Sequence, residues 1–232
     1  KAMPSATVIA SALTDSSCLP SRMAWCAQVT VQPESSKIIV IRNGRSKAYN
    51  TDGEGFLRSL KGDLKVDPKG KAVLLFGCGG AAKAIAFVLA REGARSMTFV
   101  DRIEKRAKDL AAKTKKDFPR CRAKHISFLK SRIGEEARDS DLLVNASPVG
   151  MHKGDPCIIN PKALHKDLAV YDIVYNPQAT PLLKEATRRG IRASNGLGML
   201  LYQGVLSFEL FTGRKAPVSV MRSALMKAVK KC

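Results

Sequence analysis

The sequence predicts an α/β fold with a doubly wound parallel sheet, and two observations support this prediction. Apolar runs alternate with segments of helical spacing from residue 72 to residue 189, and such alternation typically gives a parallel sheet with helices on both faces. The 232 residues are 45% hydrophobic and 26% charged, which is ordinary for a globular protein and too apolar for a disordered one. No stretch approaches the ~18 consecutive apolar residues of a transmembrane helix, so we expect no membrane partner.

The individual elements follow from local patterns. Residues 72–76 form a continuous apolar run, as expected of a strand buried on both faces. Residues 81–91 have helical spacing and stop before Gly93. The same alternation predicts further strands at residues 96–100, 141–145 and 168–174, and helices at residues 104–116 and 180–189. Outside this region we expect a hairpin of residues 37–41 and 46–49 around Asn43-Gly44, a short helix at 55–60, and helices at 197–211 and 218–229.

Much of the net charge of +20 lies between Arg102 and Arg132, where the sequence has twelve Lys and Arg residues and three acidic ones. No aromatic platform of the kind that single-strand nucleic-acid binders usually require interleaves these charges. A solvated helix face is therefore favoured, and a nucleic-acid-associated protein using residues 102–132 is the alternative. The six cysteines show no CxxC pair and no metal spacing, so we expect reduced thiols, no metal site and a cytoplasmic protein. The scarcity of acidic residues in 1–35 leaves organellar targeting open.

A glycine-rich segment, Gly77-Cys-Gly-Gly-Ala-Ala82, lies between a predicted strand and a predicted helix. Gly77 permits a tight turn, Gly79 lets the backbone approach a pyrophosphate, and Ala82 keeps the helix close to the strand. The helix N-terminus adds positive potential. This pattern predicts a dinucleotide at residues 77–82 of a Rossmann-like sheet.

The residues after the second predicted strand give conflicting indications of the cofactor. Asp101 is placed to accept hydrogen bonds from a ribose diol, which favours NAD and repels a 2′-phosphate. Arg102, Lys105 and Arg106 follow it and could neutralise that phosphate, which favours NADP. From the residues alone the choice stays open.

Three other segments could carry chemistry. Asn50-Thr-Asp-Gly53 comes just before a predicted helix, where Thr or Asp could simply be an N-cap. Asn145-Ala-Ser-Pro-Val-Gly-Met151 and Tyr171-Asp-Ile-Val-Tyr-Asn-Pro177 each follow a strand, at the edge where open α/β sheets bind ligands. In the third segment, residues 195–203, Met199 taken alone is more often a core residue and Gln203 a surface amide.

Together, NTDGEGF, GCGGAA, NASPVGM with YDIVYNP, and NGLGMLLYQG resemble the shikimate dehydrogenase family, including its quinate/shikimate relatives, over residues 38–225. The resemblance implies reversible reduction of 3-dehydroshikimate to shikimate with NADP(H), and leaves a homodimer open. It also implies a partial substrate-binding domain at 1–55, a dinucleotide-binding domain at 56–195, and C-terminal helices at 196–232 that complete the truncated substrate domain.

The resemblance assigns roles to individual residues. Asp52 would be catalytic, as part of a Lys/Asp pair, and would contact substrate together with Tyr175 and Gln203. The dinucleotide would contact Gly77, Cys78, Gly79, Gly80, Ala81, Asp101, Arg102, Arg106, Ile173 and Gly196, with Met199 near the nicotinamide.

The sequence departs from the family where the catalytic lysine belongs. In the family an Asn-Val-Thr-x-Pro-x-Lys motif precedes the NTDG segment, whereas here Glu34 stands where the lysine is expected. Lys37 and Lys47 are the nearby alternatives, and neither lies in a matching motif. A non-catalytic dinucleotide-binding relative is therefore the second hypothesis.

Overall fold

The computed structural model describes residues 37–42 and 45–229. The chain divides into two compact units, Lys1–Tyr49 and Asn50–Cys232, which we describe separately. In the first unit, β1 (Lys37–Arg42) pairs with β2 (Arg45–Asn50), which confirms the predicted hairpin strands. The turn at Asn43-Gly44 and the amino-terminal segment with Glu34 lie outside the described residues. The Lys47 ammonium lies 5.1 Å from the centroid of the Tyr49 ring, a cation–π distance.

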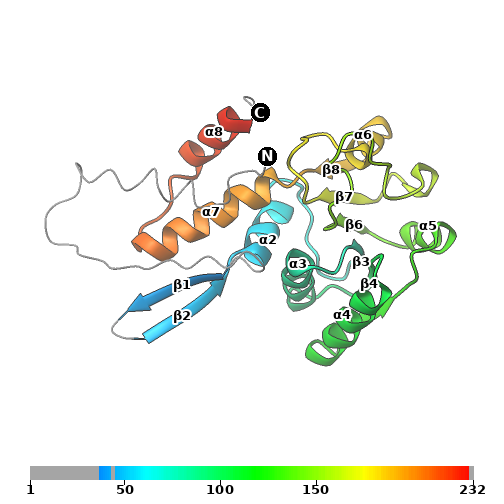
Figure 1. Ribbon diagram of the computed structural model, residues 1–232, viewed down its shortest axis with the longest axis horizontal. Coiled ribbons are helices and arrows are strands. Elements are labelled where there is room, and N and C mark those ends of the chain that lie inside the picture. Colours follow the sequence, from blue (N-terminus) through cyan, green and yellow to red (C-terminus); the bar gives the residue numbers. More distant parts are fainter. Residues whose placement is uncertain (1–36, 43–44, 230–232) are drawn as a thin grey trace, which may run out of the picture. The chain divides into compact units, whose positions relative to one another are not determined.

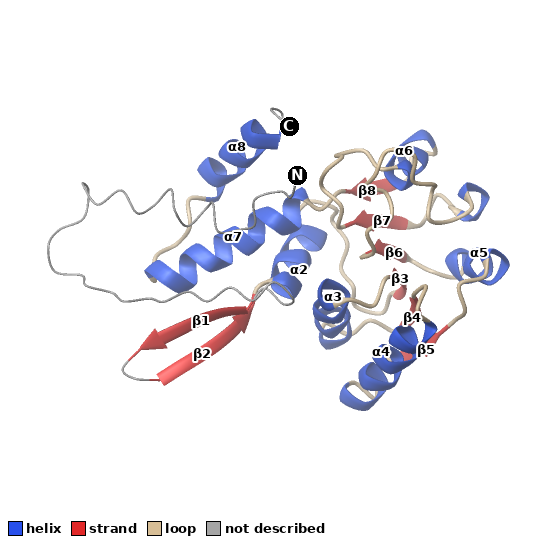
Figure 2. Ribbon diagram, in the orientation of Figure 1, coloured by secondary structure: helices blue, strands red, loops and turns tan. Residues whose placement is uncertain are grey.

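The second unit is built on a six-stranded sheet in the order β5-β4-β3-β6-β7-β8 (Figure 2). All neighbouring strands pair in parallel, and this order is that of a doubly wound dinucleotide-binding fold. The fold class expected from the sequence is thus confirmed. The strands are β3 (Ala72–Phe76), β4 (Ser96–Val100), β5 (Arg122–His125), β6 (Leu142–Asn145), β7 (Ala169–Asp172) and β8 (Arg192–Ser194).

Helices cover both faces of this sheet, and each face has its own hydrophobic core (Figure 1). The first core includes side chains of α3 (Gly80–Arg91) and α4 (Glu104–Asp117). The second includes α5 (Lys130–Arg138), α6 (Pro181–Arg188) and the 3₁₀ turn η1 (Pro161–Ala163). All five residues of β3 are buried, as its continuous apolar run predicts.

Three further helices belong to the second unit: α2 (Asp52–Gly62), α7 (Leu197–Thr212) and α8 (Val218–Val229). Helix α2 packs between α3 and α7, and glycines make these contacts close. A Cβ at Gly53 would lie 2.8 Å from the Ala84 carbonyl oxygen of α3, and one at Gly55 would lie 2.9 Å from the Met199 carbonyl oxygen of α7. Within the described ranges, no helix is long and apolar enough to cross a membrane.

Candidate active site

The glycine turn after β3 has the geometry that the sequence predicts. Gly77 adopts a φ of +83°, which side chains rarely tolerate, and a Cβ there would lie 2.6 Å from the Ala146 carbonyl oxygen. Gly79 faces open space, because nothing lies within 4 Å of the position that its Cβ would occupy. Helix α3 begins at Gly80, next to this space, so its first N–H groups and its positive end are available to an anion. The turn can therefore hold a pyrophosphate.

The Asp101 carboxylate connects the glycine turn to the loop after β4. Its Oδ2 accepts a hydrogen bond from the Cys78 N–H at 2.7 Å, and its Oδ1 accepts one from the Ile103 N–H at 2.8 Å. Burial and the Asp101 charge raise the pKa of the Cys78 thiol to about 12, so this thiol stays protonated. Asp101 therefore stabilises the glycine turn from the neighbouring loop. The ribose contact that the sequence suggests for it stays a prediction.

The side chains that could contact a 2′-phosphate lie just beyond this carboxylate. Arg102, Lys105 and Arg106 are exposed at the start of α4. Lys105 pairs with Asp109, with 2.9 Å between its Nζ and the carboxylate oxygen. Along α4 the basic face is partly compensated in this way, since Lys113 pairs with Asp117 at the same spacing. Paired surface charges are typical of a solvated helix face.

Asp52 and Gln203 come together although 151 residues separate them in the sequence. The Gln203 Nε2 donates a hydrogen bond of 2.9 Å to the Asp52 Oδ1, and Asp52 is buried, with 6% exposure. Gln203 is therefore not an isolated surface amide. Asp52 does not act as the N-cap, because Thr51 holds that position without a side-chain cap bond and the Asn50 Oδ1 accepts from the Asp52 N–H at 2.9 Å. The carboxylate is left facing α7.

A hydrogen-bond chain that begins at the buried side chains of Tyr171 and Ser59 holds α2 against the sheet. The Tyr171 hydroxyl of β7 donates to the Ser59 Oγ at 2.7 Å, and the Ser59 hydroxyl donates to the Asp63 Oδ2 at 2.8 Å. Burial raises the pKa of Tyr171 above its usual value, so the phenol remains a donor. A Cβ at Gly198 would clash with Ser59 and Asp63. The sequence analysis does not predict a role for Ser59. The available signal is that Ser59 is a polar residue between the apolar residues of the buried helix face.

The remaining predicted residues occupy different surroundings. Tyr175 lies on the loop after β7 with 40% of its surface exposed. Met199 is buried in the first core at the start of α7, so it packs as a core residue. Gly196, the N-cap of α7, lies against Ile173, because a Cβ there would overlap the Ile173 carbonyl oxygen. The structure thus brings Gly196 and Ile173 together and leaves Tyr175 open to solvent.

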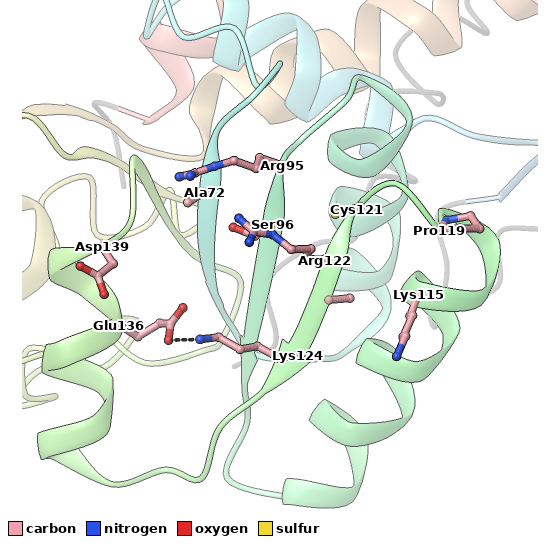
Figure 3. Close-up of a pocket in the computed structure, with 11 residues that line it drawn as sticks. Ala72, Arg95, Ser96, Lys115, Pro119, Cys121, Arg122, Lys124, Glu136 and Asp139 are labelled. Carbon is pink, nitrogen blue, oxygen red and sulfur yellow. Dashed lines mark ion pairs between the residues drawn. The ribbon is translucent and has the colours of Figure 1, made fainter.

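A cavity of about 470 Å³ lies at the amino ends of β3, β4 and β5 (Figure 3). The glycine turn follows the carboxyl end of β3, at the other end of the strands. The walls of the cavity mix charges of both signs, and the Lys124 ammonium points to the Glu136 carboxylate, 2.7 Å away. Ligands of doubly wound sheets bind at the carboxyl ends of the strands. This cavity is therefore separate from the candidate site.

Comparison with known proteins identifies the family of this chain. Residues 196–226 match the family model for the shikimate 5'-dehydrogenase C-terminal domain. The chain is similar to a shikimate dehydrogenase (NADP(+)) of Methanopyrus kandleri, with 45% identity over 186 residues that cover 79% of this chain and 64% of the relative. It is also similar to a shikimate dehydrogenase (NADP(+)) of Desulforamulus reducens, with 42% identity over 195 residues, 83% of this chain and 67% of the relative. The chain belongs to the shikimate dehydrogenase family.

A solved structure of a family member agrees with the fold. The shikimate 5-dehydrogenase of Listeria monocytogenes, crystallised with shikimate and NAD, superposes with a TM-score of 0.76 and 31% identity, over 81% of this chain and 66% of the Listeria chain. This chain therefore spans slightly less than two thirds of the lengths of the Methanopyrus and Listeria proteins.

Proposed function

We propose that this protein interconverts 3-dehydroshikimate and shikimate with NADP(H) as the hydride carrier. The observation that carries the proposal is the hydrogen bond between Asp52 and Gln203. It places a buried carboxylate and an amide side by side on α2 and α7, and α2 is packed against the helix that follows the glycine turn. Such a pair can bind and orient vicinal hydroxyls of a small polyol.

Most of the predicted residues have a specific part in this proposal. The bound dinucleotide would accept or supply the hydride. Residues 77–82 would hold its pyrophosphate, and Arg102 and Arg106 its 2′-phosphate. Asp52 would orient the reacting hydroxyl and polarise its O–H bond, while Gln203 and Tyr175 would hold neighbouring hydroxyls. NADP is favoured by the two exposed arginines and by the cofactor named for the Methanopyrus and Desulforamulus relatives.

The test is oxidation of shikimate, followed at 340 nm with NADP⁺ and separately with NAD⁺. Asp52→Asn keeps an oxygen that can accept from Gln203 but removes the charge, so turnover should fall by about 10²–10⁴-fold. Cofactor affinity should stay unchanged, since Asp52 lies outside the glycine turn. Asp117→Asn, which removes an exposed carboxylate at the carboxyl end of α4, is the matched control. Wild-type-like turnover in Asp52→Asn would refute the assignment of Asp52.

Nucleotide binding without turnover is the second candidate, because none of residues 1–51 stands in the motif that carries the family's lysine. A preorganised ammonium beside the substrate oxygen is worth roughly 3–4 kcal/mol, so its loss would leave turnover very low. Family-like turnover would instead mean that another lysine acts. Lys37→Met and Lys47→Met, made separately, would identify it.

A further inference from the structure

A buried polar pair joins the ends of β6 and β7, the two strands whose loops enter the candidate site. Asn145 and Asp172 are register partners in the sheet, and both are 0% exposed. The Asn145 Nδ2 donates to the Asp172 Oδ1 at 2.9 Å. These are the last residues of their strands, so the pair lies where the chain leaves the sheet.

Asn145 also fixes the loop that follows β6. Its Oδ1 accepts from the Ser147 N–H at 3.1 Å and from the Ser147 hydroxyl at 2.6 Å. Its Nδ2 donates to the Val149 carbonyl oxygen at 3.0 Å. One side chain thus bonds to two residues of its own loop and to the neighbouring strand.

Asp172 does the same for the loop that follows β7. Its Oδ1 accepts from the Val174 N–H at 3.1 Å, and its Oδ2 accepts from the Thr180 hydroxyl at 2.7 Å. Thr180 is fully buried at the N-cap of α6, where its Oγ1 accepts from the Leu183 N–H. A buried carboxylate is costly unless several donors surround it, and three donors meet this one.

The two loops contact parts of the proposed cofactor site that are distant in the sequence. Ala146, next to Asn145, has its carbonyl oxygen against Gly77 in the glycine turn. Ile173, next to Asp172, has its carbonyl oxygen against Gly196 at the start of α7. The Gly196 N–H donates to the Val174 carbonyl oxygen at 3.1 Å. A displacement of either loop would therefore move these cofactor contacts.

We infer that Asn145, Asp172 and Thr180 form a buried clamp that positions the loops 146–151 and 173–178 for cofactor binding. The inference rests on the proposed function and adds positioning residues to it. None of the three needs to touch the cofactor, since each acts through the neighbouring backbone.

The test compares two threonine-to-valine variants. Thr180→Val removes the hydroxyl that donates to Asp172, and Thr98→Val removes a similarly buried hydroxyl that donates to Glu136 at 2.6 Å in the middle of β4. Thr180→Ser keeps the hydroxyl and should rescue. The readouts are NADPH affinity, from fluorescence titration, and hydrogen exchange of the Ser147, Val174 and Gly196 amides.

Thr180→Val should accelerate exchange at these amides about tenfold and weaken NADPH binding about tenfold. Thr98→Val should lower the thermal midpoint about as much as Thr180→Val does, while amide exchange and NADPH affinity stay unchanged. Thr180→Ser should behave as wild type. Unchanged exchange in Thr180→Val, or equal effects of Thr98→Val, would overturn the clamp. Faster exchange with unchanged affinity would overturn its role in cofactor binding. If the wild type binds neither NADP⁺ nor NADPH, the proposed function fails, and hydrogen exchange still decides whether the clamp holds the loops.

Discussion

Among single residues, Asp101 has a structural role beside the ribose contact that we predict for it. It accepts hydrogen bonds from backbone N–H groups of the two loops that flank the proposed adenosine site. These bonds offset part of its charge, which helps to explain how a carboxylate can stand beside residues that would hold a 2′-phosphate.

Asp101→Asn should raise the preference for NADP⁺ over NAD⁺ about fivefold, because removing one charge near the 2′-phosphate relieves roughly 1 kcal/mol of repulsion. The affinity for both cofactors should also decrease, because the asparagine amide has one oxygen and can keep only one of the two hydrogen bonds that Asp101 accepts from the Cys78 and Ile103 N–H groups. Dissociation constants for the two cofactors would measure both effects. Arg102→Gln should shift the preference the other way. An unchanged ratio in Asp101→Asn would show that its carboxylate does not face the ribose.

Gly79 permits a test of cofactor binding without damage to the fold. It has an extended backbone (φ −77°, ψ −165°), and a Cβ there meets nothing within 4 Å. Gly79→Val should therefore leave the thermal midpoint unchanged but weaken NADPH binding by about tenfold or more, at least 1.4 kcal/mol. Gly134→Val, on α5 and away from the turn, is the control. Equal affinity in both variants would exclude the pyrophosphate from this turn.

Among the elements, α2 owes its position to the glycines of the NTDGEGF segment. Gly53 allows contact with α3 and Gly55 allows contact with α7. Because the Asp52–Gln203 bond spans the interface between α2 and α7, the separation of these helices controls the site.

Gly55→Ala should force the two helices apart, since its Cβ would lie 2.9 Å from both the Gln203 Cγ and the Met199 carbonyl oxygen. We expect a loss of about 1–3 kcal/mol in the free energy of unfolding and a lower turnover. Gly62→Ala is the matched control on the same helix, because its Cβ would meet only the Tyr202 Oη, at 3.3 Å. Urea unfolding of both variants gives the comparison. A wild-type midpoint in Gly55→Ala would mean that this packing is looser than described.

The element boundaries show what sequence patterns can predict. The strands at 72–76 and 96–100 match their predicted limits because all residues of the first and the last four of the second are buried. The strands β5 (Arg122–His125) and β8 (Arg192–Ser194), and the helix α5, were not predicted. Both strands lie at sheet edges and consist mostly of polar residues, so neither has the apolar run that marks a central strand. Pairing with an adjacent strand makes them strands, and local sequence does not encode that pairing.

At the scale of the whole molecule, a buried carboxylate links stability to pH. Burial raises the pKa of Asp172 from 3.8 to about 6 in the folded protein. The folded state therefore binds a proton that the unfolded state has released, so Asp172 should lower the free energy of unfolding by up to about 3 kcal/mol as the pH rises from about 4 to 6.

Asp172→Asn cannot ionise and should remove this dependence. We would measure the free energy of unfolding of both proteins from pH 4 to pH 7. As the pH rises, the wild type should lose stability relative to Asp172→Asn, and the difference should level off above about pH 6. Using the difference cancels the contributions of Asp155 and Glu185. Hydrogen bonds lower the pKa values of these two carboxylates, so their effects on stability have the opposite sign. A constant difference would contradict the raised pKa.

The candidate site was only partly predictable from sequence. The glycine turn has a local signature, because strand, turn and helix follow one another in the chain. Asp52 and Gln203 have no such signature, since their meeting depends on the docking of helices that lie far apart in sequence, and only the family resemblance indicated their roles. The partners of Asn145 and Asp172 were missed for the same reason.

The packing of α2 has a consequence for motion. Gly53 brings α2 into direct contact with the backbone of α3, and α2 shares the first core with α3 and with Met199 of α7. The helix that carries the Asp52 carboxylate and the helix that follows the glycine turn are thus packed into one hydrophobic core. We therefore expect thermal fluctuations to leave the distance from Asp52 to the glycine turn nearly constant, and we expect a hinge that admits the proposed substrate to lie outside α2 and α3.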